Sequence, residues 1–596
     1  MNPNLEKRER RKLIPLILII AIIPFLVYEI KYYPHLSEGL GYELSTDSYD
    51  YFLAIKQYAL FLCGAIMLVI LAIDKVKNQK KFIYAKTLVP LMVYVFFTFL
   101  SEMTAINKKF AFLGGFAQFQ GFLAIVVYII SIFYAIQYIH SLEDVKYMIK
   151  MLSVSVIIMI ALGVLQFLGY DFLNTSFYRH IITPISEWHN LAQLSRNNLG
   201  SSVILTLYNP NYVGSYIALM LPLSIVSIYI GVSKKEIIKY IVIAAGLAIC
   251  LIGSGSATGF IAAIAEAVFL IVLLRKQLIK RWYFTASVVV VGVIGCLLPY
   301  TRQKIDAVLD HTDHVKQDYN LTNITTNDQN VGITYKGNTV YINQFLDGEM
   351  FYGYTICDEF NGAIDYTYDE ETFTYTITDE RFAGIQVMPL ILSDVFTMKV
   401  TIDGKEWIFT NQLGNKDTYY YYNHGYCYDK IVPAKSIGFR GKESFASGRG
   451  YIWSRTLPLI KDHIFLGCGS DNFIFAFPAK DYVMSENAGF GGQILTKPHS
   501  MYLQIAIESG VVSLIAFLVF YIMYFISSIR LYLKSVDHHE LKKYGVGIFI
   551  GTIGYMVAGL ANDSMICVAP IFWAFIGIGI AINRIIRNEQ KEMTEE

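Results

Sequence analysis

Long apolar runs recur along most of this 596-residue chain, and they constrain its fold more than any other feature. A helix needs about 20 apolar residues to cross the roughly 30 Å hydrocarbon core of a bilayer. Hydrophobic residues make up 54% of the sequence and charged residues only 16%, whereas a typical soluble domain has about 25% charged residues. The sequence therefore predicts an all-α polytopic protein embedded in a lipid bilayer.

Twelve runs are candidate transmembrane helices. They are Leu13–Ile30, Phe52–Ile73, Ile83–Leu100, Gly121–Ile139, Leu152–Leu168, Tyr212–Ile230, Ile238–Ile252, Gly259–Leu274, Tyr283–Leu298, Tyr502–Ser527, Gly545–Leu560 and Met565–Ile582. The seventh and eighth are short and closely joined, so one alternative is a re-entrant pair. Basic residues before the first run resemble the start of a signal peptide. No small-residue cleavage site follows them, so we expect a true span there.

Lysine and arginine gather in alternate connections between these runs. They crowd the N-terminus, residues 75–81, 234–239, 275–281 and 530–543, and the C-terminal tail. The positive-inside rule then predicts a multi-pass protein of the cell membrane with both termini in the cytoplasm. The large loop 299–499 would lie on the extracellular or periplasmic side.

The overall charge and the cysteines exclude other classes of protein. A formal net charge of +1 gives no electrostatic case for binding nucleic acid. The seven cysteines form no CxxC pair, so the sequence shows no pattern of a zinc or iron–sulfur site. We expect neither a metal nor a cofactor.

The outer loop divides by composition, which gives five predicted segments. Residues 1–298 hold the first nine helices, 299–329 a linker, 330–435 an extracellular β-rich insertion, 436–500 a catalytic-loop segment, and 501–596 the last three helices and a cytoplasmic tail. The insertion has 15 Asp/Glu against 7 Lys/Arg and alternating apolar runs, the last folded by Asp403-Gly404, a strong hairpin signal. From Gly450 to Gly467 the spacing predicts an amphipathic helix lying on the membrane.

Two features of the insertion remain open from the sequence. Its many tyrosines, Tyr419–Tyr422 among them, either grip a glycan or build a small β core. Cys357 and Cys427 both lie on the oxidising side, where a disulfide between them is one alternative.

Three stretches carry a resemblance to a known family. They are Thr206-Leu-Tyr-Asn-Pro-Asn-Tyr-Val-Gly-Ser-Tyr, then Gly448-Arg-Gly-Tyr-Ile-Trp with Leu466-Gly-Cys-Gly-Ser-Asp-Asn-Phe, and Pro498-His-Ser-Met-Tyr-Leu-Gln-Ile-Ala-Ile-Glu-Ser-Gly. In this order, around a long outer loop, they resemble the O-antigen ligase-related family over roughly residues 200–580. The resemblance implies an integral-membrane glycosyltransferase with a GT-C-like fold that works on the outer face of the membrane. Its members are bacterial polysaccharide ligases and polymerases that use undecaprenyl-diphosphate-linked glycans without a metal.

The chain departs from the family pattern at two points. Ser500 follows His499 where the family usually has asparagine. The turn after the seventh span reads Gly253-Ser-Gly-Ser-Ala-Thr-Gly, where the family often has an arginine. The insertion at 330–435 is also outside the common pattern. Either another cation replaces the missing arginine, with Arg196, Arg302 and Arg449 as the candidates, or its role is not filled in this chain.

The chemistry of a lipid diphosphate donor suggests two catalytic residues. Charge builds on the departing diphosphate and must be met by fixed cations. Arg449 is the first candidate, because guanidinium binds phosphate oxygens in a bidentate fork. The acceptor hydroxyl must lose a proton, and neutral imidazole accepts one near pH 7. His499, at a helix N-terminus that itself favours anions, is the candidate base.

The other candidates are assigned to substrate binding, each against a simpler structural role. Arg302 and Lys497 are juxtamembrane cations that could equally anchor the chain, and Asn209 and Asn211 could equally form a helix-starting turn. Asp471, Glu508 and Asp563 complete the set, with Arg196. The acceptor is another repeat unit in a polymerase, or an anchoring glycan or cell-envelope molecule in a ligase.

Two rival functions follow from other features. Glu266, near the middle of the eighth span, is the kind of intramembrane carboxylate that a glycolipid transporter or flippase would use. No repeat relates the two halves, however, and transporters seldom have a 200-residue outer loop. A non-catalytic glycan-binding scaffold is the third possibility, with the β-rich insertion as its working part.

Overall fold

The computed structural model describes residues 9–33, 36, 48–115, 117–191, 202–231, 233–283, 286, 318–347, 350–413, 418–534 and 540–595. Within these residues, eight helices are long and apolar enough to cross a membrane. They are α4 (Ala54–Val76), α5 (Val89–Thr104) with its leading turn η3 (Lys86–Leu88), α8 (Leu142–Phe167), α10 (Pro210–Ile230), α11 (Lys234–Ser254), α12 (Ala257–Lys280), α19 (Val511–Lys534) and α21 (Ala569–Glu595). The chain is a multi-pass membrane protein.

The first predicted span is not one continuous helix. It consists of α2 (Ile14–Ile17), a π-helical turn η1 (Leu18–Ile22) and a 3₁₀ turn η2 (Ile23–Phe25). Pro24 has no backbone N–H and a fixed φ, so it cannot continue the helix from the preceding residues. The chain then runs into a short strand, β1 (Ile30–Tyr32), which pairs with β2 (Ser48–Asp50).

Three more predicted spans differ from the structure in length or continuity. The span Tyr502–Ser527 is split into α18 (Met501–Glu508) and α19, and Gly510 between them has a φ of +96° that favours glycine. α7 (Phe122–Tyr138) has only 17 residues, and α20 (Glu540–Ala558) is not among the eight. The span Tyr283–Leu298 lies almost wholly outside the described residues, so a count of twelve is not confirmed.

The seventh and eighth spans are longer than predicted. α11 has 21 residues and α12 has 24, and each is long enough to cross a bilayer by itself. Short helices and turns fill the connections elsewhere, namely α6 (Lys108–Leu113), η4 (Phe172–Asn174), α9 (Ser176–Ile182) and η5 (Ile185–Asn190).

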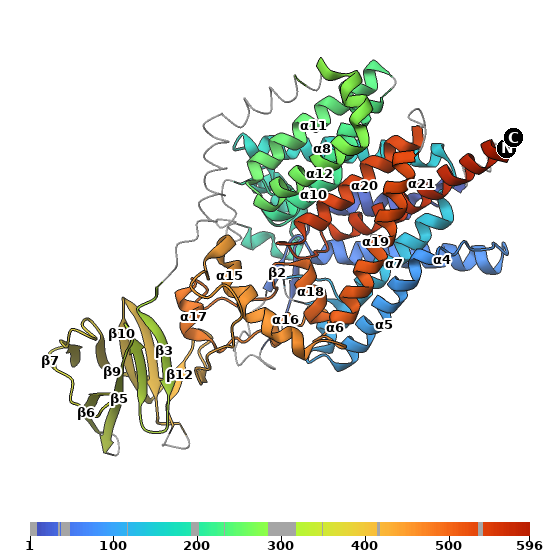
Figure 1. Ribbon diagram of the computed structural model, residues 1–596. Helices are drawn as coiled ribbons and strands as arrows, with labels where there is room; N and C mark the ends of the chain where they lie inside the picture. The colour runs from blue at the N-terminus through green and yellow to red at the C-terminus, as the bar shows by residue number, and fades with distance from the viewer. Residues whose placement is uncertain are drawn as a thin grey trace.

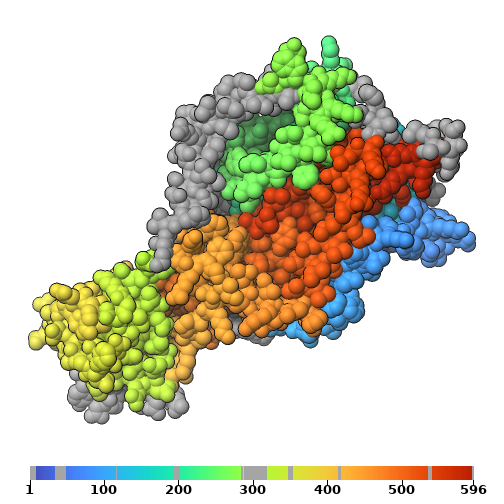
Figure 2. All heavy atoms as spheres, viewed as in Figure 1, coloured from blue at the N-terminus to red at the C-terminus, as the bar shows by residue number. Residues whose placement is uncertain are grey.

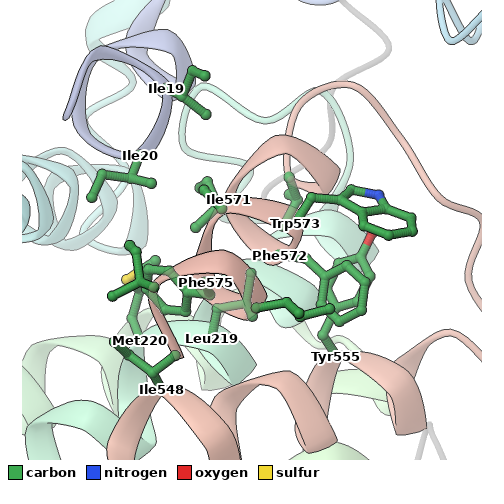
Figure 3. Close-up of a cluster of buried hydrophobic side chains, with 14 of the residues drawn as sticks. Ile19, Ile20, Leu219, Met220, Ile548, Tyr555, Ile571, Phe572, Trp573 and Phe575 are labelled. Carbon is green, nitrogen blue, oxygen red and sulfur yellow. The ribbon is translucent and has the colours of Figure 1, made fainter. Parts of the chain in front are cut away.

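The core of the bundle lies where α10, α20 and α21 meet. Figure 3 shows Leu219 and Met220 of α10, Ile548 and Tyr555 of α20, and Phe575 of α21 turned toward one another. A side chain at Gly551 would come within 2.7 Å of the Leu219 carbonyl oxygen. This close approach follows the small-residue rule of membrane helices, where packing must supply the attraction that water supplies to soluble proteins.

One end of the bundle is rich in cations. Lys12 forms a 2.8 Å ion pair with Asp74 at the end of α4, and Lys80 donates to the carbonyl of Gln137 in the last turn of α7. Arg584 of α21 donates to the carbonyls of Ile136 and Ile139. α21 continues toward the C-terminus at this end, which faces away from the β strands in Figure 1.

The predicted β-rich insertion is a pair of antiparallel β-sheets. The first has the order β3-β4-β5-β6 and the second β13-β12-β11-β10-β9-β8-β7. The strands are β3 (Leu321–Thr326), β4 (Val331–Tyr335), β5 (Asn338–Asp347), β6 (Met350–Asp358), β7 (Tyr366–Asp369), β8 (Thr374–Ile377), β9 (Gln386–Leu392), β10 (Val395–Ile402), β11 (Lys405–Thr410), β12 (Tyr420–Tyr422) and β13 (Tyr428–Asp429). β3 lies in the segment predicted to be a linker, so the sheet begins before residue 330.

The structure tests two sequence features of this β module, the Asp403-Gly404 hairpin signal and the run of tyrosines. Asp403 and Gly404, both with positive φ, form the β10–β11 hairpin turn, because Ile402 pairs with Lys405. Tyr419 and Tyr421 are buried among the residues of the module's core, which favours the structural role for these two rings.

The possible disulfide is not formed. Cys357 and Cys427 are both free thiols, and both are partly buried. Cys357 lies on β6, whereas Cys427 immediately precedes β13 at the far edge of the other sheet. The placement of the two thiols on different sheets accounts for the outcome.

The segment 436–499 lies between the β module and the helices, as the gold-to-orange surface in Figure 2 shows. It contains α15 (Phe445–Thr456), η6 (Leu457–Asp462), α16 (Phe473–Ala476) and α17 (Tyr482–Asn487). The helix predicted from Gly450 to Gly467 is present as far as Asp462, with its last turns 3₁₀-helical, but Tyr451 and Ile452 do not lie on a membrane surface. The α-helix ends at Thr456, and Tyr451 and Ile452 pack in a protein core with Phe473 and Phe477.

Candidate active site

The imidazole of His499 is held by a carboxylate from another part of the chain. His499 directly precedes Ser500, the N-cap of α18, and has a left-handed φ of +52°. Its Nδ1 lies 3.0 Å from Oδ2 of Asp563, in the connection between α20 and α21. The Asp563 side chain is fully buried, whereas the imidazole is 34% exposed. With Nδ1–H donating to the carboxylate, Nε2 keeps its lone pair and can accept a proton.

Three positive or partly positive groups surround the Asp563 carboxylate. Burial alone raises the pKa of Asp563. The His499 imidazole, by its charge and its hydrogen bond, and the cations Lys497 and Arg449 bring that pKa below its usual range. The carboxylate is therefore ionised at neutral pH and fixes the orientation of the ring.

Arg449 is presented by an unusual backbone turn in α15. Ala446, Ser447 and Gly448 all have positive φ, of 51°, 59° and 86°. Two of these are not glycine, and such left-handed backbone costs on the order of 1 kcal/mol or more per residue. The turn leads directly into Arg449, and strain of this kind is found mostly at functional positions.

The Arg449 guanidinium faces the same connection that carries Asp563. Its Nε donates to the carbonyl of Ala561 at 3.0 Å and its Nη1 to the carbonyl of Ala446 at 2.8 Å. Among the described residues it has no carboxylate within ion-pair distance, and Nη2 has no hydrogen-bond partner. Arg449 thus keeps its positive charge available to an anion beside His499.

Lys497 is a second cation next to the first. It is buried, its Nζ donates to the Tyr212 hydroxyl at 3.1 Å, and it lies 5.7 Å and 5.6 Å from the ring centres of Tyr208 and Tyr212. No described carboxylate lies within ion-pair distance of it. Burial lowers its pKa from the usual range, against the opposing charge of Asp563. Its Nζ also lies 4.0 Å from the Met565 sulfur. A buried ammonium held by rings, a hydroxyl and a thioether is well placed to meet a negative ligand.

The two predicted asparagines have structural roles of different kinds. Asn209 caps α10 by accepting from the Asn211 backbone N–H at 2.9 Å. Asn211 lies nearer to the site, because its carbonyl accepts from Asn562 and its side chain accepts from Ser256 at 3.5 Å. Ser256 belongs to the turn where the family's arginine is missing, so that turn lies beside the site.

Asp471 and Glu508 are buried behind this group. Asp471 Oδ2 accepts from the backbone N–H groups of Gly115 and Gln120 at 2.8 Å and 2.9 Å. Burial raises the pKa of Asp471 to about 7 despite these bonds. Glu508 is in the last turn of α18, where its carbonyl accepts from Gly469. These contacts indicate that the two acids fix the Gly467–Asn472 loop on the helices.

Several residues that complete the site were not singled out from the sequence. Asn562 donates to Thr258 at 2.7 Å and to Ser215 at 3.2 Å, linking α10, α12 and the Asp563 connection. Tyr212 lies in the quoted Tyr-Asn-Pro-Asn-Tyr motif, which could have pointed to it. Arg196 and Arg302 lie outside the described residues. Glu266 packs against Gly554 in the bundle, and no described contact links it to this site.

One comparison with known proteins gave a match. A family model described as O-antigen ligase matches residues 386–518, which include Arg449, Lys497 and His499. The resemblance to the O-antigen ligase-related family is confirmed. The match begins inside the β module, at β9, and ends in α19. No curated protein and no solved structure matches the chain. The match supports, in broad terms, a membrane enzyme that ligates or polymerises glycan.

Proposed function

We propose that this protein is a glycosyltransferase that transfers or polymerises undecaprenyl-diphosphate-linked glycan on the outer face of the cytoplasmic membrane. The observation that carries the proposal is the convergence of His499, Arg449 and Lys497 on Asp563, because the imidazole binds its carboxylate and the charges of both cations act on it. A base beside an anion site is what transfer from a lipid diphosphate requires.

The reaction breaks one bond and forms one. The acceptor hydroxyl attacks the anomeric carbon of the donor sugar, and the bond from that carbon to the diphosphate oxygen breaks. The acceptor's proton moves to Nε2 of His499, and the electron pair leaves with undecaprenyl diphosphate. Asp563 stabilises the imidazolium that forms, as the buried carboxylate does in other His–Asp pairs.

The two cations act on the leaving group. Negative charge builds on the diphosphate as the bond to the sugar breaks, so fixed positive charges stabilise the transition state more than the ground state. Arg449 can offer Nη2 to a phosphate oxygen while Nε and Nη1 stay bound to the backbone. Lys497 supplies a charge fixed by its aromatic surroundings.

The decisive experiment uses purified protein in vesicles with undecaprenyl-diphosphate oligosaccharide. Wild type should join or elongate glycans, and His499→Ala should slow transfer by about 10²–10⁴-fold, the usual worth of a general base. His180→Ala, an exposed histidine of α9, is the matched control. Glycolipid translocation without transfer in the same vesicles would favour the transporter, and an active His499→Ala enzyme would refute the base.

A further inference from the structure

The end of the bundle opposite the β module contains a cavity that the proposed reaction does not use. It lies between η3, the end of α7, α19 and α21, and measures about 990 Å³ including its open mouth. Ile83, Ile136 and Ile580 line its apolar side. Lys86, Arg584, Arg587 and Lys591 line its polar side. The cavity therefore combines hydrocarbon with four cations, at the ends of membrane-spanning helices.

In the part of the chain that the structure describes, no acidic side chain neutralises these cations. Among the described residues, none of the four forms an ion pair. Arg584 donates to the carbonyls of Ile136 and Ile139 at 2.7 Å and 2.8 Å, and Arg587 donates to Ser527 Oγ at 2.6 Å. Burial and the neighbouring charges of Lys80 and Arg584 lower the pKa of His140 at the same end, as a positive local potential would. An anion bound in the cavity would balance the positive charge of these four side chains.

Two buried oxygen atoms in the cavity wall also lack partners. Asn583, 2% exposed, donates through Nδ2 to Ser528 at 2.8 Å, but its Oδ1 accepts no hydrogen bond from the described residues. Thr87 Oγ1 is buried and likewise unpaired within that part of the chain. Both residues line the cavity. A buried oxygen without a donor is costly, so a ligand with hydroxyl groups would stabilise this wall.

We propose that this cavity binds the headgroup of an anionic phospholipid that carries free hydroxyls, such as phosphatidylglycerol. Its phosphodiester would contact the cations, its glycerol hydroxyls would donate to Asn583 and Thr87, and its acyl chains would follow the apolar side into the bilayer. Basic pockets between membrane helices bind lipid phosphates for these reasons. With the positive-inside orientation, the lipid comes from the cytoplasmic leaflet.

Native mass spectrometry of the full-length protein, with lipid added to delipidated detergent samples, tests the proposal. Wild type should bind one phosphatidylglycerol in preference to phosphatidylcholine. The double variant Arg587→Ala/Lys591→Ala should raise the dissociation constant by about 30-fold, at about 1 kcal/mol for each lost cation. Lys77→Ala/Lys81→Ala, at the same end but outside the cavity, is the matched control.

Each other outcome has a stated meaning. Equal weakening in both double variants would overturn the site, because it would indicate only non-specific surface charge. Equal affinity for phosphatidylcholine would refute the need for an anionic lipid. Full competition by soluble glycerol phosphate would show that the cavity binds a soluble phosphate ester and not a lipid. Lys86→Glu provides a second variant at the rim of the cavity, and its failure to weaken binding would also count against the proposal.

Discussion

The Nδ1 atom of His499 lies 3.0 Å from Oδ2 of Asp563, across 64 residues of sequence. The carboxylate is fully buried and the imidazole is partly exposed, so the pair presents one free ring nitrogen toward the surface. Arg449 reaches the same connection through the carbonyl of Ala561. This relationship is the basis of the first two predictions.

Asp563→Asn should slow glycan transfer by up to about 10⁴-fold, the cost of replacing the aspartate that orients the general-base histidine in a His–Asp pair. The amide can still contact the ring, but it neither stabilises the imidazolium nor selects the Nδ1–H tautomer. Single-turnover transfer with wild type, Asp563→Asn and the exposed-residue control Asp394→Asn would check this.

The pH dependence of glycan transfer can be interpreted because the charge of the Asp563 carboxylate is known over the pH range of the assay. Because the pKa of Asp563 lies below its usual range, the carboxylate should remain ionised over about pH 5 to pH 8. Loss of wild-type activity with acid in that window would therefore not be due to protonation of Asp563. An Asp563→Asn enzyme with wild-type rates would contradict the role of the pair.

Arg449→Lys should lose most activity while membrane insertion stays normal. Lysine keeps the charge but cannot donate to Ala446 and Ala561 and to a phosphate oxygen at once. Transfer assays and expression in the membrane fraction measure the two effects separately. Arg440→Lys, an exposed arginine nine residues earlier, controls for the substitution. Full activity of Arg449→Lys would reduce Arg449 to an anchor.

Lys497→Met should lower kcat/KM for the lipid-linked donor. Methionine keeps contact with Tyr208 and Tyr212 but removes the charge that meets the diphosphate. The value of kcat/KM should fall at least about tenfold, the cost of one charge-assisted contact of roughly 1.5 kcal/mol. Lys461→Met, exposed in the same segment 436–499, should leave kcat/KM unchanged. An unaltered kcat/KM for Lys497→Met would remove this lysine from the donor site.

The Asp471→Asn variant should be more stable than wild type, and this difference in stability should grow as the pH rises. Burial raises the pKa of Asp471 to about 7, so the fold favours the neutral form. The stability contributed by that form is fully present below the ordinary value of 3.8 and is lost as pH rises through about 7. Asparagine stays neutral and can still accept from Gly115 and Gln120. Thermal unfolding in detergent at about pH 5 and about pH 8 should show a larger benefit at the higher pH, and the reverse order would refute a buried carboxylate.

The β module should be accessible from outside the cell. In a background with Cys357 and Cys427 replaced by serine, a membrane-impermeant thiol reagent should label Ser393→Cys in intact cells. Lys77→Cys, just beyond α4, should react only after permeabilisation. Protection of Ser393→Cys in intact cells would invert the orientation and place the candidate site in the cytoplasm.

Much of the fold was predictable because it depends on local patterns. Eight of the predicted spans are long apolar helices, since hydrophobic length alone decides whether a helix can cross a bilayer. The hairpin at Asp403-Gly404 followed from residues that tolerate positive φ. Sequence patterns gave a wrong prediction where the outcome depends on which other parts of the protein pack against a segment. The apolar residues Tyr451 and Ile452 pack on other protein residues, and a periodicity shows that a face is apolar without showing what covers it.

The sequence by itself determined that this is a multi-pass membrane protein with a β-rich insertion, and that its motifs resemble one family of glycan-joining enzymes. Only the tertiary structure decided which of the candidate residues meet. It joined His499 to Asp563, set Lys497 among Tyr208 and Tyr212, and assigned Asn209 to a helix cap. These contacts join segments far apart in the chain, through helix packing and a few positive-φ turns. Neither periodicity nor composition encodes that packing, because both describe only neighbours along the chain.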